Sequence, residues 1–200
     1  RDWITSRGLG DVYKRQAPYN NKYATVDDWK RLSKEIYDAS PVINGIKVPI
    51  LWGTDAVHGH NNLIGATIFP HNIGLGATRN ADLVRDIGKA TALEVISTGV
   101  IWTFAPAITA PQDLKWGRTY EGYSEDSNIV SVMGGALIEG LQGRNKDFLS
   151  NNHILATAKH FIGDGGTFDG IDRGNTKLSE EELKRVHGIQ YFTALDVCSQ

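Results

Sequence analysis

The chain has 200 residues, of which 40% are hydrophobic and 22% are charged, and its formal net charge is −2. That composition is typical of a globular domain with one sizeable core, and it gives no reason to expect nucleic acid or an anionic membrane as a partner. No apolar run in the sequence approaches the roughly 20 residues of a membrane-spanning helix. Cys198 is the single cysteine, which excludes an internal disulfide bond and a thiolate metal cluster.

The first residues differ in character from the rest of the chain. They are basic, show no clear amphipathic period, and contain a run, GLGDVYKRQ, that resembles a translated linker found as a contaminant in assembled sequence data. We therefore expect residues 1–16 to be an artefactual or disordered leader. The domain is then expected to occupy residues 17–200.

A helix and a strand are predicted first. Residues 25–40 carry apolar side chains at helical spacing and begin with a capping-box pattern, Thr25 with Asp28, and Pro41 ends the helix. Residues 48–53 form a short, continuous apolar run, which predicts a buried strand.

A second helix is predicted over residues 80–98. Asn80 is a favourable N-cap, and Gly99 suits the position after the last turn, which often requires a positive φ. Residues 100–105 are again continuously apolar and predict the second buried strand.

The same pattern then occurs once more and begins a fourth time. A third helix is predicted to start at Ser124 and to end at Gly143, and residues 154–161 predict the third strand. Ser179 with Glu182 forms another capping-box pattern and starts a fourth helix.

The elements therefore follow the order of a helix and then three strand–helix pairs, which predicts the α/β class. Continuous apolar strands suit a parallel sheet that is buried on both faces. A complete (β/α)₈ barrel takes about 250 residues, so these elements cannot close one. The residues from about Val197 onward read as the approach to another strand. The loop residues favour a TIM-like barrel, truncated after about three to four βα units, over a small open sheet.

Charged side chains follow each predicted strand. Asp55 comes after the first strand, Arg118 lies beyond the second, and Lys159 and His160 end the third. In a barrel these strand ends converge on one pocket. A carboxylate, a guanidinium, an ammonium and an imidazole together suit a neutral ligand with many hydroxyl groups, because hydroxyl groups both donate and accept hydrogen bonds.

Tryptophans near these strand ends offer apolar ring faces to the carbon-bound face of a sugar. They are Trp52, Trp102 and Trp116. Core packing is the simpler interpretation for Trp102, and for Trp29 in the first predicted helix.

Three segments resemble the motifs of glycoside hydrolase family 3, in particular of its β-glucosidase and exo-1,3/1,4-β-glucanase branch. They are GTDAVHG at residues 53–59, KWGRTYEGYSED at residues 115–126 and KHFIGDGGT at residues 159–167. The resemblance covers about residues 48–197. It implies an N-terminal (β/α)₈-like barrel domain followed by a second, α/β sandwich domain, and it implies no cofactor.

The same resemblance assigns roles to residues at the strand ends. Asp55, Arg118, Lys159 and His160 are expected to bind hydroxyl groups of the sugar in the −1 subsite. Glu121 is expected not to contact the sugar itself but to orient Arg118 or Lys159, which do. The partners implied are a β-glucoside or β-glucan oligosaccharide and the remainder of the barrel with the sandwich domain.

The family hydrolyses with retention, so two carboxyl groups act as nucleophile and acid/base. The resemblance places the nucleophile, an Asp followed by Trp, on a later barrel strand, and the acid/base Glu in or near the second domain. The one Asp-Trp pair after the leader, Asp28-Trp29, falls in the first predicted helix, and we do not take Asp28 as the nucleophile.

We therefore expect the full-length protein to remove terminal non-reducing β-D-glucosyl residues from β-glucans or oligosaccharides. This chain, without either catalytic carboxyl group, is expected to be inactive alone. The family resemblance suggests a periplasmic or secreted location.

Two alternatives stay open. His58 and His60 form a His-x-His pattern, and with Asp164 or His160 they fit a metal-dependent barrel hydrolase, although this pattern is a weak signal. The chain is alternatively a non-catalytic carbohydrate-binding fragment.

The run GDGG at residues 163–166 argues against two further possibilities. It lacks the GxGxxG spacing of a nucleotide-binding loop. It also lacks the histidine that the N-acetylglucosaminidase branch of the family carries there.

Overall fold

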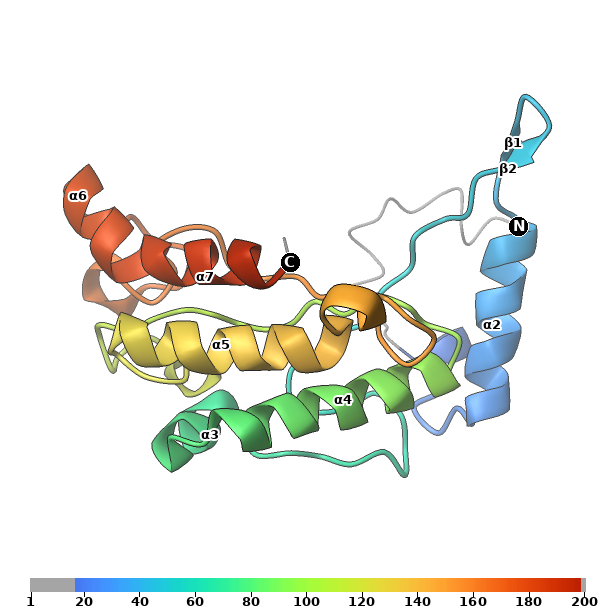
Figure 1. The fold of residues 1–200 in the computed structure, drawn as a ribbon, viewed down its shortest axis with the longest axis horizontal. Coiled ribbons are helices and arrows are strands. Elements are labelled where there is room, and N and C mark those ends of the chain that lie inside the picture. Colours follow the sequence, from blue (N-terminus) through green and yellow to red (C-terminus); the bar gives the residue numbers. More distant parts are fainter. Residues whose placement is uncertain (1–16, 199–200) are drawn as a thin grey trace.

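The computed structural model describes residues 17–198, and the predicted leader at residues 1–16 lies outside the described part. Helices α2 (Val26–Asp38), α4 (Ala81–Ser97), α5 (Ser127–Gln142) and α7 (Ile189–Cys198) form what we call the helical layer. In this layer α5 lies between α4 and α7, and α2 stands across the end of α4 (Figure 1). The Ser33 hydroxyl group of α2 donates a 2.8 Å hydrogen bond to the carbonyl of Gly99, just after α4.

Shorter elements complete the fold. They are α3 (Asn72–Thr78), α6 (Glu180–Leu183), the π-helical turn η6 (Lys184–Gly188), the 3₁₀ turns η2 (Pro18–Asn20), η3 (Thr119–Glu121), η4 (Asn145–Asp147) and η5 (Phe168–Gly170), and the strands β1 (Val42–Ile43) and β2 (Ile46–Lys47). The helix α3 and the β1–β2 hairpin were not predicted from the sequence. Among the described residues, no helix is both long and apolar enough to span a membrane.

The predicted caps of the first two long helices are confirmed. The Thr25 side chain accepts a hydrogen bond from the backbone N–H of Asp28, and the Asp28 carboxylate accepts one from the N–H of Thr25, so the capping box that starts α2 is complete. Asn80 caps α4 by accepting from the N–H of Leu83. Gly99 follows α4 with a φ of 80°, which is costly for residues with a Cβ atom.

The third long helix begins later than predicted. Asp126, and not Ser124, is the N-cap of α5, because its carboxylate accepts a 2.9 Å hydrogen bond from the backbone N–H of Asn128. The Ser124 hydroxyl group instead accepts from the N–H of Asp126 in the preceding turn. Gly143 ends α5, as predicted, with a φ of 72°.

The fourth predicted helix is present but is interrupted. Ser179 and Glu182 form the expected capping box at the start of α6. The π-helical turn η6 then separates α6 from α7. The helix α7 runs on to Cys198, so the interpretation of Val197 and Cys198 as the approach to a strand is wrong. Apolar side chains of α7 pack against α5, and this packing favours continuing the helix.

The three predicted strands are extended and parallel, but they are not regular strands. Parallel bridges join Thr54 to Thr103, Trp102 to Leu155, and Ala107 to Lys159. The segment that contains Trp102 therefore lies between the other two. Backbone hydrogen bonds of 3.0 Å from the N–H of Thr54 to the carbonyl of Trp102, and of 2.8 Å from the N–H of Thr103 to the carbonyl of Leu155, hold this order.

The prediction that these strands are buried on both faces is wrong for the first and second. Val48, Ile50, Leu51 and Ile101 are all exposed. A parallel strand becomes buried only when other elements cover both of its faces, and in the described part of the chain these side chains remain uncovered. The core lies instead where the helical layer packs on the segments, and it includes Trp29, Val84, Val95, Leu141 and Ile154.

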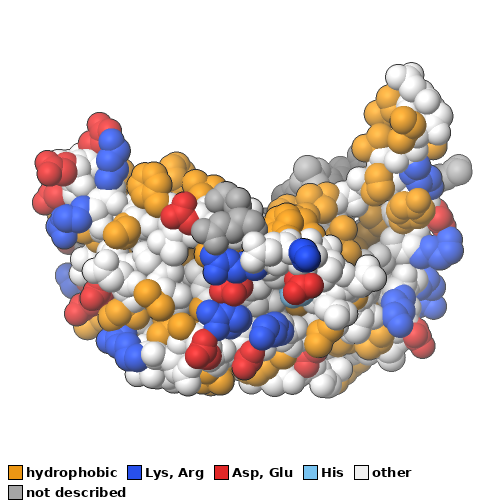
Figure 2. All heavy atoms as spheres, viewed as in Figure 1, with side chains coloured by type: hydrophobic (Ala, Val, Ile, Leu, Met, Phe, Trp, Pro, Cys, Tyr) orange, Lys and Arg blue, Asp and Glu red, His pale blue; other side chains and the backbone are white. Residues whose placement is uncertain are grey.

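The β1–β2 hairpin projects from the body of the molecule, and hydrophobic side chains gather on it (Figure 2). Its antiparallel register pairs Val42 with Lys47 and Ile43 with Ile46. It lies next to the end of α2, where the Lys47 ammonium group donates to the carbonyls of Tyr37 and Asp38. These bonds occupy the last carbonyl groups of the helix.

Candidate functional site

Two side chains from the first and third extended segments meet at the ends of those segments. The Lys159 ammonium group lies 2.8 Å from Oδ1 of Asp55, although the two residues are 104 positions apart in the sequence. Both side chains are largely shielded, with 13% and 22% of their surfaces exposed respectively. An ion pair in this setting is screened less by water than a pair on an open helix surface.

Polar groups behind Asp55 hold its backbone in place. The Thr103 hydroxyl group accepts from the N–H of Ala56 at 3.2 Å and donates to the carbonyl of Thr54 at 3.1 Å. The Asn62 amide group donates to the Thr54 hydroxyl oxygen and to the Asp55 carbonyl. Asp55 is therefore positioned by side chains on both sides of it.

Lys159 is held through its backbone by the middle segment. Its N–H donates to the carbonyl of Pro106 at 3.0 Å, and its carbonyl accepts from the N–H of Ile108 at 2.8 Å. These two bonds belong to the parallel bridge at Ala107. The position of the ammonium group thus depends on pairing between segments and not on local sequence.

Arg118 is anchored by a carboxylate three residues along the chain. Its Nε and Nη2 each donate a 2.8 Å hydrogen bond to one oxygen of Glu121, in the bidentate arrangement that suits a guanidinium group. Glu121 raises the pKa of Arg118, so the guanidinium group stays charged. The fully buried Asn72 in turn donates a 2.8 Å hydrogen bond to the backbone carbonyl of Glu121.

His160 joins Arg118 to a further carboxylate. Nη2 of Arg118 lies 2.9 Å from Nε2 of His160. On the other side of the ring, Nδ1 of His160 lies 2.7 Å from Oδ2 of Asp164, an ion-pair distance without the alignment of a hydrogen bond. We call the six residues the strand-end cluster: Asp55, Arg118, Glu121, Lys159, His160 and Asp164.

The structure thus brings the predicted site residues together in two adjoining groups. Asp55 pairs with Lys159, Arg118 pairs with Glu121 and His160, and the peptide bond between Lys159 and His160 connects the two groups. Glu121 contacts Arg118, which is one of the two partners expected for it. The roles of these residues toward a sugar stay predictions.

The tryptophans are less available to a ligand than expected. Trp116 is buried, and its indole N–H donates to Asp172 at 3.1 Å. Trp52 stacks on the fully buried Trp29 with ring centroids 5.7 Å apart. Trp102 is half-buried, and its indole N–H donates to the Thr157 hydroxyl group at 2.7 Å. Core packing is confirmed for Trp29, whereas Trp52 and Trp102 retain some exposed surface.

The two histidines of the metal-site alternative contact different partners. His60 is fully buried, and its ring packs edge-on against Trp29 with Nε2 3.2 Å from the Thr98 hydroxyl oxygen. His58 instead stacks on His71, with ring centroids 4.0 Å apart. Within residues 17–198, no group of three or more His, Cys, Asp or Glu side chains is placed to hold a metal ion. The geometry therefore does not support the metal-dependent interpretation.

The sequence did not reveal the residues whose side chains fix the backbone around Asp55 and Glu121 by hydrogen bonds. Asn62, Asn72 and Thr103 lie in segments without a distinctive motif, so no local signal marked them. Asp164 lies inside the GDGG run and was considered only as a metal ligand. Its position four residues after His160, in a glycine-rich turn, was the available signal.

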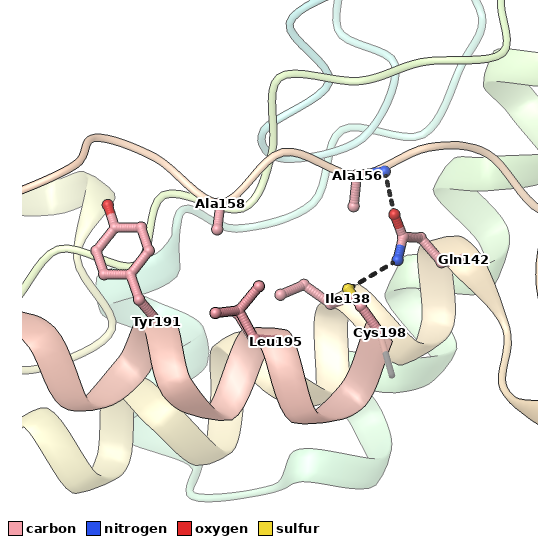
Figure 3. Close-up of a pocket in the computed structure, with 8 residues that line it drawn as sticks. Ile138, Gln142, Ala156, Ala158, Tyr191, Leu195 and Cys198 are labelled. Atoms are coloured by element: carbon pink, nitrogen blue, oxygen red, sulfur yellow. Dashed lines mark hydrogen bonds between the residues drawn. The ribbon is translucent and has the colours of Figure 1, made fainter. Parts of the chain in front are cut away.

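A cavity of about 170 Å³ lies on the other side of the third segment, where helices α5 and α7 pack (Figure 3). Ala156 and Ala158 line it, whereas Lys159 follows at the next position and contacts Asp55, as the alternation of an extended chain requires. Gln142 accepts a hydrogen bond from the N–H of Ala156 and donates to the Cys198 sulfur in this cavity (Figure 3). The cavity is therefore separate from the Asp55–Lys159 pair.

The strand-end cluster contains charges of both signs. Two cationic side chains face three carboxylates, with one imidazole between them, and the cluster offers both donors and acceptors within a small volume. A single anion or cation is not the matching ligand for such a set. A neutral molecule with several adjacent hydroxyl groups matches it well, because each hydroxyl group can donate to a carboxylate while accepting from a cation.

Comparison with known proteins gives a consistent result. A family model described as the glycosyl hydrolase family 3 N-terminal domain matches residues 1–200. The lysosomal beta glucosidase of Dictyostelium discoideum is 36% identical over 142 residues, which are 70% of this chain and 17% of that protein. The periplasmic beta-glucosidase of Salmonella typhimurium is 28% identical over 166 residues, which are 83% of this chain and 21% of that protein.

Among solved structures, the exo-1,3/1,4-beta-glucanase of a Pseudoalteromonas species matches with a TM-score of 0.87 and 49% identity, over 92% of this chain and 23% of that one. The α/β, TIM-barrel-like class predicted from the sequence is confirmed by these matches. The chain spans about a fifth of the length of these relatives.

Proposed function

The chain belongs to glycosyl hydrolase family 3, and from that membership we propose that its full-length protein is a retaining glycosidase. The proposed reaction is the hydrolysis of terminal non-reducing β-D-glucosyl residues of β-glucans or oligosaccharides. Support comes from relatives whose names are beta-glucosidase or exo-beta-glucanase.

The observation that carries the proposal is the strand-end cluster. Asp55 and Lys159 meet although they are 104 residues apart, and Arg118 is held against both Glu121 and His160. We propose that Asp55, Arg118, Lys159 and His160 bind hydroxyl groups of one glucosyl unit in the −1 subsite. Glu121 keeps the guanidinium plane of Arg118 in place for that contact. A hydrogen bond to a charged group contributes about 1.5–3 kcal/mol, so a few such contacts hold one ring in one orientation.

We further propose that the two catalytic carboxyl groups come from polypeptide outside this chain. Asp28, the one carboxylate followed by tryptophan after the leader, closes the capping box of α2 and pairs with Arg31 at 2.6 Å. Its place in a helix N-terminus explains its presence without a catalytic role. In this proposal the described residues form the first βα units of a (β/α)₈ barrel, and a second α/β sandwich domain completes the active site.

A periplasmic or secreted location is part of the same proposal. The Salmonella typhimurium relative is named a periplasmic beta-glucosidase, and this name supports the proposed location.

The proposal is tested by measuring sugar binding and hydrolysis with the purified 200-residue chain. We expect isothermal titration to detect glucose and laminaribiose, and we expect no release of p-nitrophenol from p-nitrophenyl β-D-glucoside. Asp55→Asn removes a charged acceptor from the sugar and should weaken glucose binding about tenfold or more.

The matched control is Asp38→Asn, which neutralises the carboxylate of the exposed Lys34–Asp38 pair on α2 and should leave binding unchanged. Equal binding by wild type and Asp55→Asn would overturn the assignment of the sugar site. Hydrolysis by the chain alone would overturn the placement of the catalytic carboxyl groups elsewhere.

A further inference from the structure

The ring of His160 is held between a cation and an anion. Nη2 of Arg118 lies 2.9 Å from Nε2 on one side, and Oδ2 of Asp164 lies 2.7 Å from Nδ1 on the other. A neutral imidazole carries one proton, and its two nitrogens then play opposite roles in hydrogen bonding. The identity of the two neighbours therefore determines which nitrogen carries the proton.

The Arg118 side decides the assignment. A guanidinium group has donors and no acceptor, and the bidentate contact with Glu121 keeps it charged. Nε2 of His160 must therefore accept a hydrogen bond from Arg118 and carries no proton in this arrangement. The ring proton is then on Nδ1, where the nearest charged group is the Asp164 carboxylate.

Three buried polar atoms that have no hydrogen-bond partner among the described residues belong to side chains on which the Asp164 carboxylate acts. They are Nδ1 of His160, Nε2 of His187 and the hydroxyl oxygen of Tyr191. The carboxylate itself is shielded, with 11% of the side-chain surface exposed. Burial lowers the pKa of His187 and raises that of Tyr191, and the Asp164 charge acts on both groups. Asp164 is therefore the carboxylate whose charge acts on His187 and Tyr191 and which lies 2.7 Å from Nδ1 of His160.

The local backbone is built to place this carboxylate. Gly163 and Gly165, on either side of Asp164, have φ values of 96° and 88°, which residues with a Cβ atom rarely adopt. A Cβ atom on Gly166 would clash with Nε2 of His187, so the loop packs directly against that ring. His187 belongs to the π-helical turn η6, and such turns often occur at functional sites.

The third neighbour approaches from α7. In Figure 3 the Tyr191 ring rises from this helix with its hydroxyl group turned toward the chain that follows Ala158. The same ring packs edge-on against Phe161, with centroids 5.1 Å apart. Residues 161–166, which include Asp164, therefore pack against η6 through His187 and against α7 through Tyr191.

We infer that Asp164 is a positioning residue for the sugar site: its carboxylate, 2.7 Å from Nδ1 of His160, electrostatically favours the ring proton on that nitrogen and so leaves Nε2 free to accept from Arg118. Arg118 and His160 then act as one rigid unit, tied to Glu121 at one end and to Asp164 at the other. The inference rests on the proposed function for its effect on sugar binding, whereas the protonation of the ring is independent of any sugar.

The test combines the ring tautomer with sugar affinity. Long-range ¹H–¹⁵N correlation spectra of the wild-type chain should show His160 with its proton on Nδ1. Asp164→Ala removes the charge that favours a proton on Nδ1, so part of the population should carry the proton on Nε2, lose the contact with Arg118 and bind glucose more weakly, by up to about tenfold. Asp164→Asn keeps an amide oxygen with a partial negative charge at this position, so it should shift the tautomer less and lose less affinity than Asp164→Ala.

Asp169→Asn is the matched control, because Asp169 is an exposed acid of the same loop region whose φ of 57° asparagine tolerates well. It should change neither the tautomer nor the affinity. A residue with only a structural role would lower the melting temperature in Asp164→Ala and leave the His160 tautomer unchanged. If Asp164→Ala does not fold, the wild-type tautomer and Asp164→Asn still decide the question.

The outcomes separate the two proposals. A wild-type chain that binds glucose but carries the His160 proton on Nε2 overturns the role of Asp164 and leaves the proposed function standing. A wild-type chain with the proton on Nδ1 that binds no glucose supports the arrangement of the ring and overturns the proposed function.

Discussion

The strand-end cluster and the helical layer both contain pairs of opposite charge, but they hold them in different surroundings. In the cluster, Lys159 and Asp55 are mostly shielded and come from distant parts of the sequence. On α2, Lys34 and Asp38 are four residues apart, with 74% and 54% of their side-chain surfaces exposed. The distance between charges is similar, at 2.8 Å and 2.6 Å, so the surroundings and not the spacing distinguish the two pairs.

The comparison shows that the chain leaves some ion pairs in contact with water and shields others from it. Helix-surface pairs follow from i,i+3 and i,i+4 spacing, remain in water and contribute about 0.3–0.5 kcal/mol each. The Lys159–Asp55 pair of the cluster is largely shielded from water, and a ligand would meet it at a fixed geometry. Where the helical layer packs on the extended segments, the ring of His60 is fully buried, and the largest predicted effect comes from this ring.

The largest effect concerns pH. Burial lowers the pKa of His60 from 6.5 to about 4, and Nδ1 of this ring has no hydrogen-bond partner among the described residues. Between these values the unfolded chain binds a proton that the folded chain does not, so stability is full above pH 6.5 and is lost as the pH falls toward 4. We expect the loss to be about 3 kcal/mol from this group.

The measurement is the free energy of unfolding in urea at about pH 7 and about pH 4.5. Because carboxylates also titrate in this range, the comparison is made with His60→Asn, which cannot take up the proton. Parallel pH dependence in the wild type and the variant would show that the interior of the helical layer tolerates a charged ring.

The next effect contrasts two lysines. Lys159→Met removes the ammonium group opposite the shielded Asp55 carboxylate and should lower the free energy of unfolding by about 2 kcal/mol. Lys34→Met removes the exposed partner of Asp38 on α2 and should leave the free energy of unfolding almost unchanged, because water and salt screen this pair. Urea unfolding curves of both variants measure the difference, and equal losses would mean that shielding does not distinguish the two pairs.

Two arginines provide a comparison of ligand binding. Arg118 and Arg31 each pair with a carboxylate three residues away, the first in the cluster and the second on α2. Lysine cannot reproduce the bidentate contact of Arg118 with Glu121, so Arg118→Lys should weaken glucose binding about tenfold. Arg31→Lys should leave glucose binding unchanged in the same titration. A similar loss of glucose binding in both variants would show that binding does not depend on the contacts that Arg118 makes in the cluster.

The smallest effect tests how the helical layer is built. Asp126 caps α5 through the N–H of Asn128, so Asp126→Ala should lower the free energy of unfolding by about 1 kcal/mol. Ser124→Ala changes the residue at which the sequence alone places the cap, and it should cost less. Thermal melts of the two variants rank them, and the opposite order would restore Ser124 as the start of the helix.

Much of the helical layer could be predicted because its signals are local. The capping boxes of Thr25 with Asp28 and of Ser179 with Glu182 involve residues three positions apart, and Gly99 and Gly143 end their helices through their own backbone conformation. Where two polar residues competed nearby, as at Ser124 and Asp126, the sequence placed the cap two residues too early. The π-helical turn η6 has no comparable local signal and was missed.

The extended segments could be predicted only in part. Their existence and parallel order follow from apolar runs separated by helices, but their burial does not, because it depends on what covers them. Val48 and Ile101 have the composition of core residues and are nevertheless exposed. Trp116 was expected near the ligand and is buried instead, with its indole N–H donating to Asp172 from a later loop.

By itself, the sequence determined the helix ends, the alternation of segments and the residue types available at the strand ends, because each depends on neighbours a few positions away. The tertiary structure alone decided which of those residues meet. The contacts of Asp55 with Lys159 and of Arg118 with His160 join positions 104 and 42 residues apart. They form because parallel segments align their carboxyl ends, and this alignment is set by hydrogen bonds between segments that no local pattern records.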